Sequence, residues 1–186
     1  MEESCYFLRK NLLEPVKTVD NNITQASMRI LDSYFSSYVE NEIKKITKDE
    51  IANLESMITQ LFFFAIIWSV GTTTTLEGRT KFNKWIREKM AEYNVEFPED
   101  RAVYDYKFST ETKEWINWRD TVSEYQVDIK ASYNEILVPT LDSIRMKYWI
   151  KFLVMNSKHV LTPGPTGTGK SVNIADLMTY ELPEEY

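Results

Sequence analysis

The sequence predicts a mixed, helix-rich fold that is mainly helical at the front and ends in a strand, a glycine-rich turn and a helix. Over much of the chain, apolar side chains recur every three or four residues, the spacing of one helix face. An uninterrupted apolar run at residues 61–70 indicates a buried segment. Near the C-terminal end, residues 164–171 hold three glycines directly ahead of another helical pattern. The 186 residues are enough for one domain or for the joined ends of two.

The first long helix is predicted to follow Asp20, Asn21 and Asn22, whose side chains accept hydrogen bonds from the free amides at a helix start. Pro15 discourages extension of this helix towards the N-terminus. The apolar residues of the helix form one broad face that must pack against another part of the chain: Ile23, Ile30, Leu31, Tyr34, Phe35, Tyr38, Val39, Ile43 and Ile46.

A second helix is predicted from Asp49 to Ser69, with a break at Gly71 and the four threonines after it. Its apolar run, Leu61–Val70, is about half of the roughly 20 residues that a helix needs to cross a bilayer. We therefore interpret this run as a core segment.

A third helix is predicted over Gly78–Tyr93, with Phe82, Trp85, Ile86 and Met90 turned inward. The pattern then loosens between Val95 and Val127, where aromatic residues stand among polar ones. Short strands and an irregular aromatic layer both fit this stretch.

The C-terminal part begins, by our interpretation, at a boundary near Ala131. It is predicted to contain an extended segment at 134–138, a turn at Pro139 and Thr140, and a helix over Leu141–Met155. The inward stripe of that helix is predicted to hold Ile144, Tyr148, Phe152 and Met155. A brief strand at Lys158–Leu161 and a helix over Lys170–Tyr180, with Ile174, Leu177 and Met178 at helical spacing, are predicted to flank the glycine-rich turn.

Composition excludes some classes of function. The formal net charge of -6 and the pI near 5.0 give no surplus of positive charge for nucleic acid. The single cysteine, Cys5, cannot form an internal disulfide, and no signal peptide pattern opens the chain, so we expect an intracellular protein with Cys5 as a packed or surface thiol. We expect neither nucleic acid nor membrane as a partner.

The chemistry-bearing motif matches the P-loop pattern, in which two glycines enclose four residues and are followed by Lys and then Ser or Thr: Gly164, Pro165, Thr166, Gly167, Thr168, Gly169, Lys170 and Ser171. Glycines let the backbone wrap phosphate oxygens, so that amide groups and the start of the next helix meet the negative charge. Lys170 is predicted to reach the β- and γ-phosphates, and the Ser171 hydroxyl to ligate Mg²⁺. ATP or ADP with Mg²⁺ is therefore the expected ligand.

Hydrolysis also needs an acidic residue on a later strand and usually an arginine from a neighbour, and neither can be placed after Ser171. Asp176 and Glu181 fall on the predicted P-loop helix and are interpreted as solvated charges. We assign no catalytic residue, and we leave open whether the chain is an enzyme.

Several other residues admit a functional and a structural interpretation. Trp68, Trp115 and Trp118 fit either a stacking platform for a ligand or a structural role. Large aromatic residues more often fill a core or an interface, and we favour that structural role for these three. A single histidine, His159, without an acidic partner nearby in the sequence is interpreted as incidental. Arg79 and Arg145 are interpreted as structural.

Several segments, in this order, resemble the dynein heavy chain family: Phe7-Leu8-Arg9-Lys10-Asn11, Thr18-Val19-Asp20-Asn21-Asn22, Ile67-Trp68-Ser69-Val70-Gly71, Glu77-Gly78-Arg79, Val138-Pro139-Thr140-Leu141-Asp142-Ser143-Ile144-Arg145 and the P-loop. The resemblance covers nearly the whole chain and is more axonemal than cytoplasmic. It implies that residues 1–130 are the helical, lid-type end of the second AAA+ module, with an aromatic extension. Residues 131–186 would open the third module, an α/β P-loop subdomain.

The resemblance also implies a function. The third site of that family is regulatory, so that its nucleotide gates the main hydrolytic site and thereby microtubule release. Val138, Pro139 and Thr140 match the segment near the nucleotide base. Implied partners are the other AAA+ modules of the same chain, microtubules, and dynein intermediate and light chains. The implied location is cytoplasmic and cytoskeletal, in the axoneme of a cilium or flagellum.

One departure from the family is Pro163, which interrupts the strand usually found before the loop; we favour a position at the strand's end that leaves the site intact. Two alternatives stay open: another P-loop NTPase such as a nucleotide kinase, and a structural piece that binds no nucleotide. Because a P-loop with one strand cannot bury its apolar face, we expect weak or no binding by the chain alone.

Overall fold

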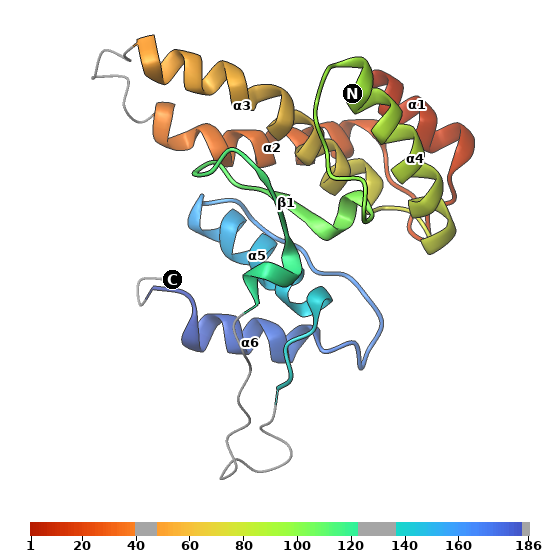
Figure 1. Ribbon diagram of the computed structural model, residues 1–186. Helices are drawn as coiled ribbons and strands as arrows, with labels where there is room; N and C mark the ends of the chain where they lie inside the picture. The colour runs from red at the N-terminus through yellow and green to blue at the C-terminus, as the bar shows by residue number, and fades with distance from the viewer. Residues whose placement is uncertain (40–47, 123–136, 184–186) are drawn as a thin grey trace. The chain divides into compact units, whose positions relative to one another are not determined.

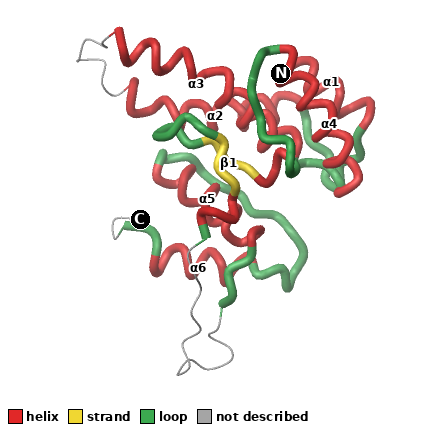
Figure 2. The backbone as a smooth tube through the Cα atoms, viewed as in Figure 1, coloured by secondary structure: helices red, strands yellow, loops and turns green. Residues whose placement is uncertain are grey.

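The computed structural model describes residues 1–39, 48–122 and 137–183 and is predominantly helical (Figures 1 and 2). The chain divides into two compact units, Met1–Asn117 and Trp118–Tyr186. The predicted boundary near Ala131 lies outside the described residues. The helix-rich fold predicted from the sequence is confirmed.

Unit 1 contains the helices α1 (Glu2–Asn11), α2 (Asp20–Val39), α3 (Lys48–Ile66) and α4 (Leu76–Glu92), and α3 continues into the π-helical turn η1 (Ile67–Gly71). Helices α2 and α3 lie side by side (Figure 1). Helix α2 begins slightly earlier than predicted: Asp20–Asn22 form its first turn, whereas the sequence placed them just ahead of the helix. Ile43 and Ile46 of the predicted apolar face lie outside the described residues.

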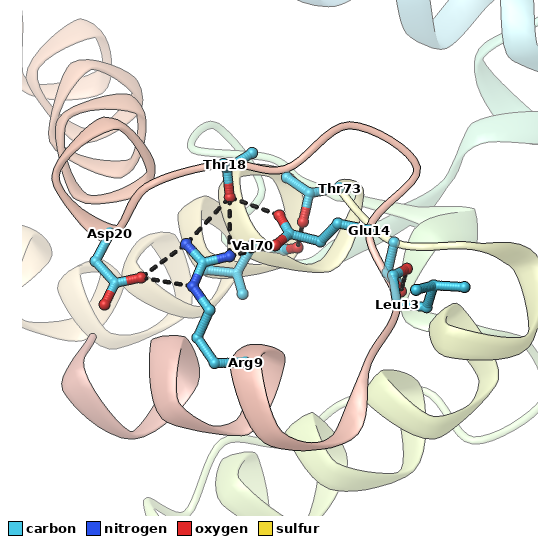
Figure 3. Close-up of polar contacts among 8 residues, drawn as sticks. Arg9, Leu13, Glu14, Thr18, Asp20, Val70 and Thr73 are labelled. Atoms are coloured by element: carbon cyan, nitrogen blue, oxygen red, sulfur yellow. Dashed lines mark hydrogen bonds and ion pairs between the residues drawn. The ribbon is translucent and has the colours of Figure 1, made fainter.

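The connection between α1 and α2 is fixed by Arg9, as Figure 3 shows. Its Nε donates to Asp20 Oδ1 at 2.9 Å, its Nη2 donates to Thr18 Oγ1 at 3.2 Å, and its Nη1 pairs with the largely buried Glu14 carboxylate. Burial alone would lower the pKa of Arg9, but the Asp20 hydrogen bond and the Glu14 charge raise it. One guanidinium thus joins the end of α1, the loop and the start of α2.

The core of unit 1 forms around the predicted apolar run. Leu61, Phe64, Ala65, Ile67 and Val70 are each at most 1% exposed, which confirms this run as a core segment. The core cluster brings together residues from α1, α2, α3, η1, α4 and the segment after α4: Cys5, Leu8, Ile23, Phe63, Ile66, Ile67, Val70, Phe82, Ile86, Met90, Val95, Val103 and Tyr104. Among the described helices, none has the length and apolar character needed to span a membrane.

The end of η1 is closely packed. A Cβ on Gly71 would lie 2.5 Å from Phe82 Cε1 and 3.0 Å from the Tyr104 hydroxyl, distances that the surrounding core cannot accommodate without shifting. The Tyr104 hydroxyl donates to the buried Gly71 carbonyl at 2.8 Å. Because burial disfavours the phenolate, the pKa of Tyr104 is raised well above its ordinary value. Gly71 therefore both ends the helix, as predicted, and admits Tyr104 to its backbone.

The loosely patterned stretch contains both features that the sequence left open. A 3-10 turn, η2 (Val103–Asp105), leads into the antiparallel pair β1 (Tyr106–Phe108) and β2 (Trp115–Asn117), in which Lys107 faces Ile116. Aromatic rings pack around this hairpin: Phe97 lies 4.6 Å from Trp115 and Phe64 lies 5.9 Å from it, between ring centroids. The hairpin is thus part of an aromatic layer.

Unit 2 contains the short 3-10 helix η3 (Trp118–Thr121), α5 (Leu141–Met155) and α6 (Lys170–Tyr180), and the bounds of both α-helices match the prediction. The predicted stripe of α5 is only partly right. Ile144, Tyr148 and Phe152 are half-buried, Met155 is 45% exposed, and Ile150, which was not predicted, is buried. The apolar residues of α5 itself are distributed around the whole helix, so their spacing does not identify which face is buried.

The predicted strand at Lys158–Leu161 is wrong, because the chain is irregular there. A strand needs hydrogen bonds to a neighbouring strand, and the described part of unit 2 offers none. Lys158, His159 and Val160 instead line an open pocket of about 460 Å³, together with apolar residues of α5 and α6 that include Val154 and Ile174.

We expect Tyr104→Phe to lower the free energy of unfolding by about 1–2 kcal/mol, because it leaves the buried Gly71 carbonyl without its donor. Tyr6→Phe is the matched control, since the Tyr6 ring is 63% exposed. Urea unfolding followed by tryptophan fluorescence measures both, and equal effects would contradict the assigned hydrogen bond.

We expect Cys5 to resist alkylation in the folded protein. Burial, and next the charge of Asp20, raise the pKa of the Cys5 thiol, so little thiolate forms near neutral pH. Iodoacetamide treatment followed by mass spectrometry of the Cys5 peptide should show slow labelling at pH 7.5. Labelling should become fast in denaturant. Fast labelling without denaturant would contradict the buried position.

Candidate functional site

The glycine-rich loop lies directly before α6, and two of its three glycines adopt a left-handed backbone conformation. Gly167 has φ +80° and Gly169 has φ +74°, values that favour glycine over any residue with a Cβ. Residues 164–168 are exposed. The loop therefore presents its backbone to solvent at the start of a helix.

Lys170 turns back onto this loop. Its Nζ donates to Gly164 O at 2.9 Å and to Thr168 Oγ1 at 3.0 Å, and it also donates to Pro165 O. The Thr168 hydroxyl in turn donates to Pro165 O at 3.0 Å. The Lys170 ammonium group is thus held within the loop. There it can replace its hydrogen bonds to the loop carbonyls with hydrogen bonds to phosphate oxygens.

The start of α6 is suited to an anion. Gly169 is its N-cap and provides no side-chain acceptor, so the first amides of α6 keep their hydrogen-bonding capacity. Free amides and the positive end of the helix dipole attract negative charge. Ser171 is exposed in the first turn, and its hydroxyl is a chemically suitable ligand for Mg²⁺. The loop and α6 together fit a phosphate group with its metal ion.

The structure does not join every predicted site residue. Gly164, Pro165, Thr168 and Lys170 are connected by hydrogen bonds, whereas no hydrogen bond among the described residues links 138–140 to the loop. Thr140 instead caps α5: its Oγ1 accepts from Ser143 N at 3.1 Å, and Ser143 Oγ accepts from Thr140 N at 2.9 Å. Val138 is exposed. A contact of 138–140 with nucleotide stays a prediction.

Helix α6 is tied to α5 by an ion cluster that the sequence analysis missed. Lys147 of α5 pairs with Asp176 and donates to Glu181 Oε1 at 3.1 Å. Burial would lower the pKa of Lys147, but these two hydrogen bonds raise it. Asp176, interpreted as a solvated charge, is instead half-buried beside Lys147, whereas Glu181 is exposed as predicted although it too is paired. Their spacing to Lys147 is not local, so no sequence pattern indicates the pairing.

Two residues of α6 are buried, Asn173 and Leu177. Of the three apolar residues noted at helical spacing, only Leu177 is fully buried, and Met178 is 57% exposed. The signal that could have revealed Asn173 is its position four residues before Leu177, on the same helix face.

The remaining candidates have structural surroundings. Trp118 is buried and lies 5.0 Å from the Tyr148 ring, and Trp68 and Trp115 both pack on Phe64, as the core interpretation predicts. The Arg79 guanidinium lies 5.6 Å from the Tyr104 ring, and Arg145 pairs with Asp142 at 3.4 Å. His159 is exposed at the rim of the unit 2 pocket.

Comparison with known proteins matches both parts of the chain. Residues 1–120 match the family model described as the dynein heavy chain AAA lid domain, and residues 125–186 match the P-loop containing dynein motor region.

Similar proteins are themselves named dyneins. Dynein axonemal heavy chain 1 is 33% identical in Mus musculus and 32% identical in Homo sapiens, in both cases over all of this chain and 5% of the relative. Dynein axonemal heavy chain 12 of Mus musculus is 32% identical over 67% of this chain and 4% of the relative. The chain thus spans about 5% or less of the length of these relatives.

The two family matches cover a helical unit and a P-loop ahead of a helix, which are the two parts that the structure contains, and the relatives match across the whole chain. The chain therefore belongs to the dynein heavy chain family, in its axonemal branch.

Proposed function

We propose that residues 164–171 bind ATP or ADP with Mg²⁺ at a regulatory AAA+ site that gates microtubule-based motility. The observation that carries this proposal is the Lys170 ammonium, which lies within a glycine loop at the uncapped start of α6. A positive charge and free amides at one place are what a polyphosphate needs. The family match to a P-loop motor region supports the same ligand.

Each residue has a defined task in this proposal. The amides of the loop and of the first turn of α6 hold phosphate oxygens, and Lys170 leaves the loop carbonyls to contact the β- and γ-phosphates. Ser171 holds Mg²⁺, which neutralises phosphate charge when it is bound. Val138, Pro139 and Thr140 are proposed to contribute to the surroundings of the base, since they match that segment of the family.

We assign binding, and no hydrolytic step, to this chain. Asp176 and Glu181 are engaged by Lys147, which leaves them unsuited to hold Mg²⁺ or orient water. We propose that ATPase activity belongs to the whole heavy chain, with the acid and the arginine supplied by other segments.

The wider assignment follows from the family. Other AAA+ modules accompany this region in dynein heavy chains, and we propose that residues 1–130 end the second module and residues 131–186 open the third. Microtubules, together with intermediate and light chains, are the proposed partners of the whole protein. The proposed location is the axoneme of a cilium or flagellum, within the cytoskeleton.

We expect Mg·ATP to protect the amides of residues 164–171 from hydrogen exchange in the full-length heavy chain, because these amides would bond to phosphate. Lys170→Ala should raise the half-maximal Mg·ATP concentration by about tenfold or more, since it removes a charge-assisted contact. Mass spectrometry of peptides from this loop reports on the site separately from other nucleotide sites. Lys151→Ala, on α5, is the matched control. If Mg·ATP does not protect the wild-type loop, the proposed nucleotide binding is wrong and the alternative of a structural piece that binds no nucleotide is favoured.

We also expect Lys170→Ala to reduce the fraction of motor that ATP releases from microtubules, because a nucleotide can shift a motor only between states that it binds differently. Co-sedimentation with microtubules, with and without ATP, measures this fraction. Release that matches the wild type, together with lost protection of the loop, would show binding without gating.

A further inference from the structure

Asn173 is a polar residue on the buried face of α6, one turn after Lys170. It is 8% exposed, and its Nδ2 donates to Gly169 O at 2.8 Å. The backbone N of the same residue donates to the same oxygen at 3.0 Å. The Gly169 carbonyl, the last of the loop, therefore accepts two hydrogen bonds from one residue.

These two bonds fix a peptide group that is otherwise easily turned. Gly169 has no Cβ and adopts φ +74°, so its own backbone preferences restrain it little. Because the peptide is planar and trans, the Lys170 N–H points opposite to the Gly169 carbonyl. A carbonyl held along α6 thus directs the Lys170 amide towards the loop, where phosphate is proposed to bind.

Within the described part of the chain, the side-chain amide of Asn173 makes no other hydrogen bond. Its Oδ1 is buried and has no hydrogen-bond partner among the described residues. A buried acceptor without a donor costs free energy, and an apolar side chain would fill the same space without that cost. Packing alone therefore does not account for an asparagine here, whereas the bond from Nδ2 to Gly169 does.

We propose that Asn173 is a positioning residue of the nucleotide site: it locks the peptide between Gly169 and Lys170, so that the Lys170 amide faces the phosphate. This inference rests on the proposed nucleotide binding. In this proposal Asn173 does not contact the nucleotide. Asn173 acts on the affinity of the loop for phosphate by holding the Lys170 amide in position.

The test uses the full-length heavy chain and Mg·ATP as the probe, with protection of the loop amides as the measurement. Asn173→Asp keeps the shape of the side chain and replaces the donor with an acceptor, which repels the carbonyl. We expect it to raise the half-maximal Mg·ATP concentration by about tenfold, equivalent to about 1.4 kcal/mol. Asn173→Ala should have a smaller effect in the same direction.

Asn173→Thr separates positioning from packing. A threonine hydroxyl in a helix can donate to the carbonyl four residues earlier, as Thr179 does to Ala175 O at 2.8 Å in this same helix. We expect this variant to bind within about threefold of the wild type, since its donor is retained. A role in packing alone predicts that the threonine variant binds as weakly as the alanine variant, which would overturn the inference.

Asn156→Ala is the matched control. Asn156 also donates its Nδ2 to the carbonyl four residues earlier, Phe152 O at 2.8 Å, but at the end of α5. Its replacement should leave loop protection unchanged. If Asn173→Asp and Asn156→Ala bind Mg·ATP equally well while the wild-type loop is protected, the inference about Asn173 alone is overturned. If the wild-type loop is not protected, the proposed function fails as well.

Discussion

Burial of the segment from Leu61 to Gly71 is the constraint on which unit 1 depends. A run this apolar has to leave water, and each fully buried Leu, Ile, Val or Phe side chain contributes about 1.5–3 kcal/mol relative to an exposed one. No single helix can cover all sides of α3 and η1, so α1, α2, α4 and the aromatic hairpin pack around them. The close fit at Gly71 follows from this arrangement, because Phe82 and Tyr104 approach the backbone where a Cβ would stand.

The segments that carry the family resemblance also have physical roles within this unit. Arg9 belongs to the first of them and Asp20 to the second, and their ion pair at 2.7 Å joins the two segments in space. The third is η1, the centre of the core. The fourth begins α4, where Thr75 accepts from Gly78 N. These four segments thus contribute an ion pair between two helices, a buried turn and a helix cap.

Local signals predicted well, and contacts between distant residues did not. The bounds of α5 and α6 follow from neighbouring residues: the Thr140–Ser143 capping pair and the loop glycines act within a few positions. The strand at Lys158–Leu161 failed because a strand requires a partner that no local pattern supplies. The Lys147 pairings were missed for the same reason, since Asp176 lies 29 positions after Lys147 in the sequence. The spacing of apolar residues predicted that α5 packs against other parts of the chain, but it did not identify the face that is buried.

Helix α6 is anchored at both ends, which bears on how the proposed site works. Asn173 fixes its start against Gly169, and Lys147 of α5 holds Asp176 and Glu181 further along. A loop whose helix is already fixed loses less freedom on binding, so more of its contact energy is available as affinity. The same anchoring joins the loop to α5. In the proposed site, a change in phosphate contacts at the start of α6 would act on α5 through the Lys147 ion pairs with Asp176 and Glu181.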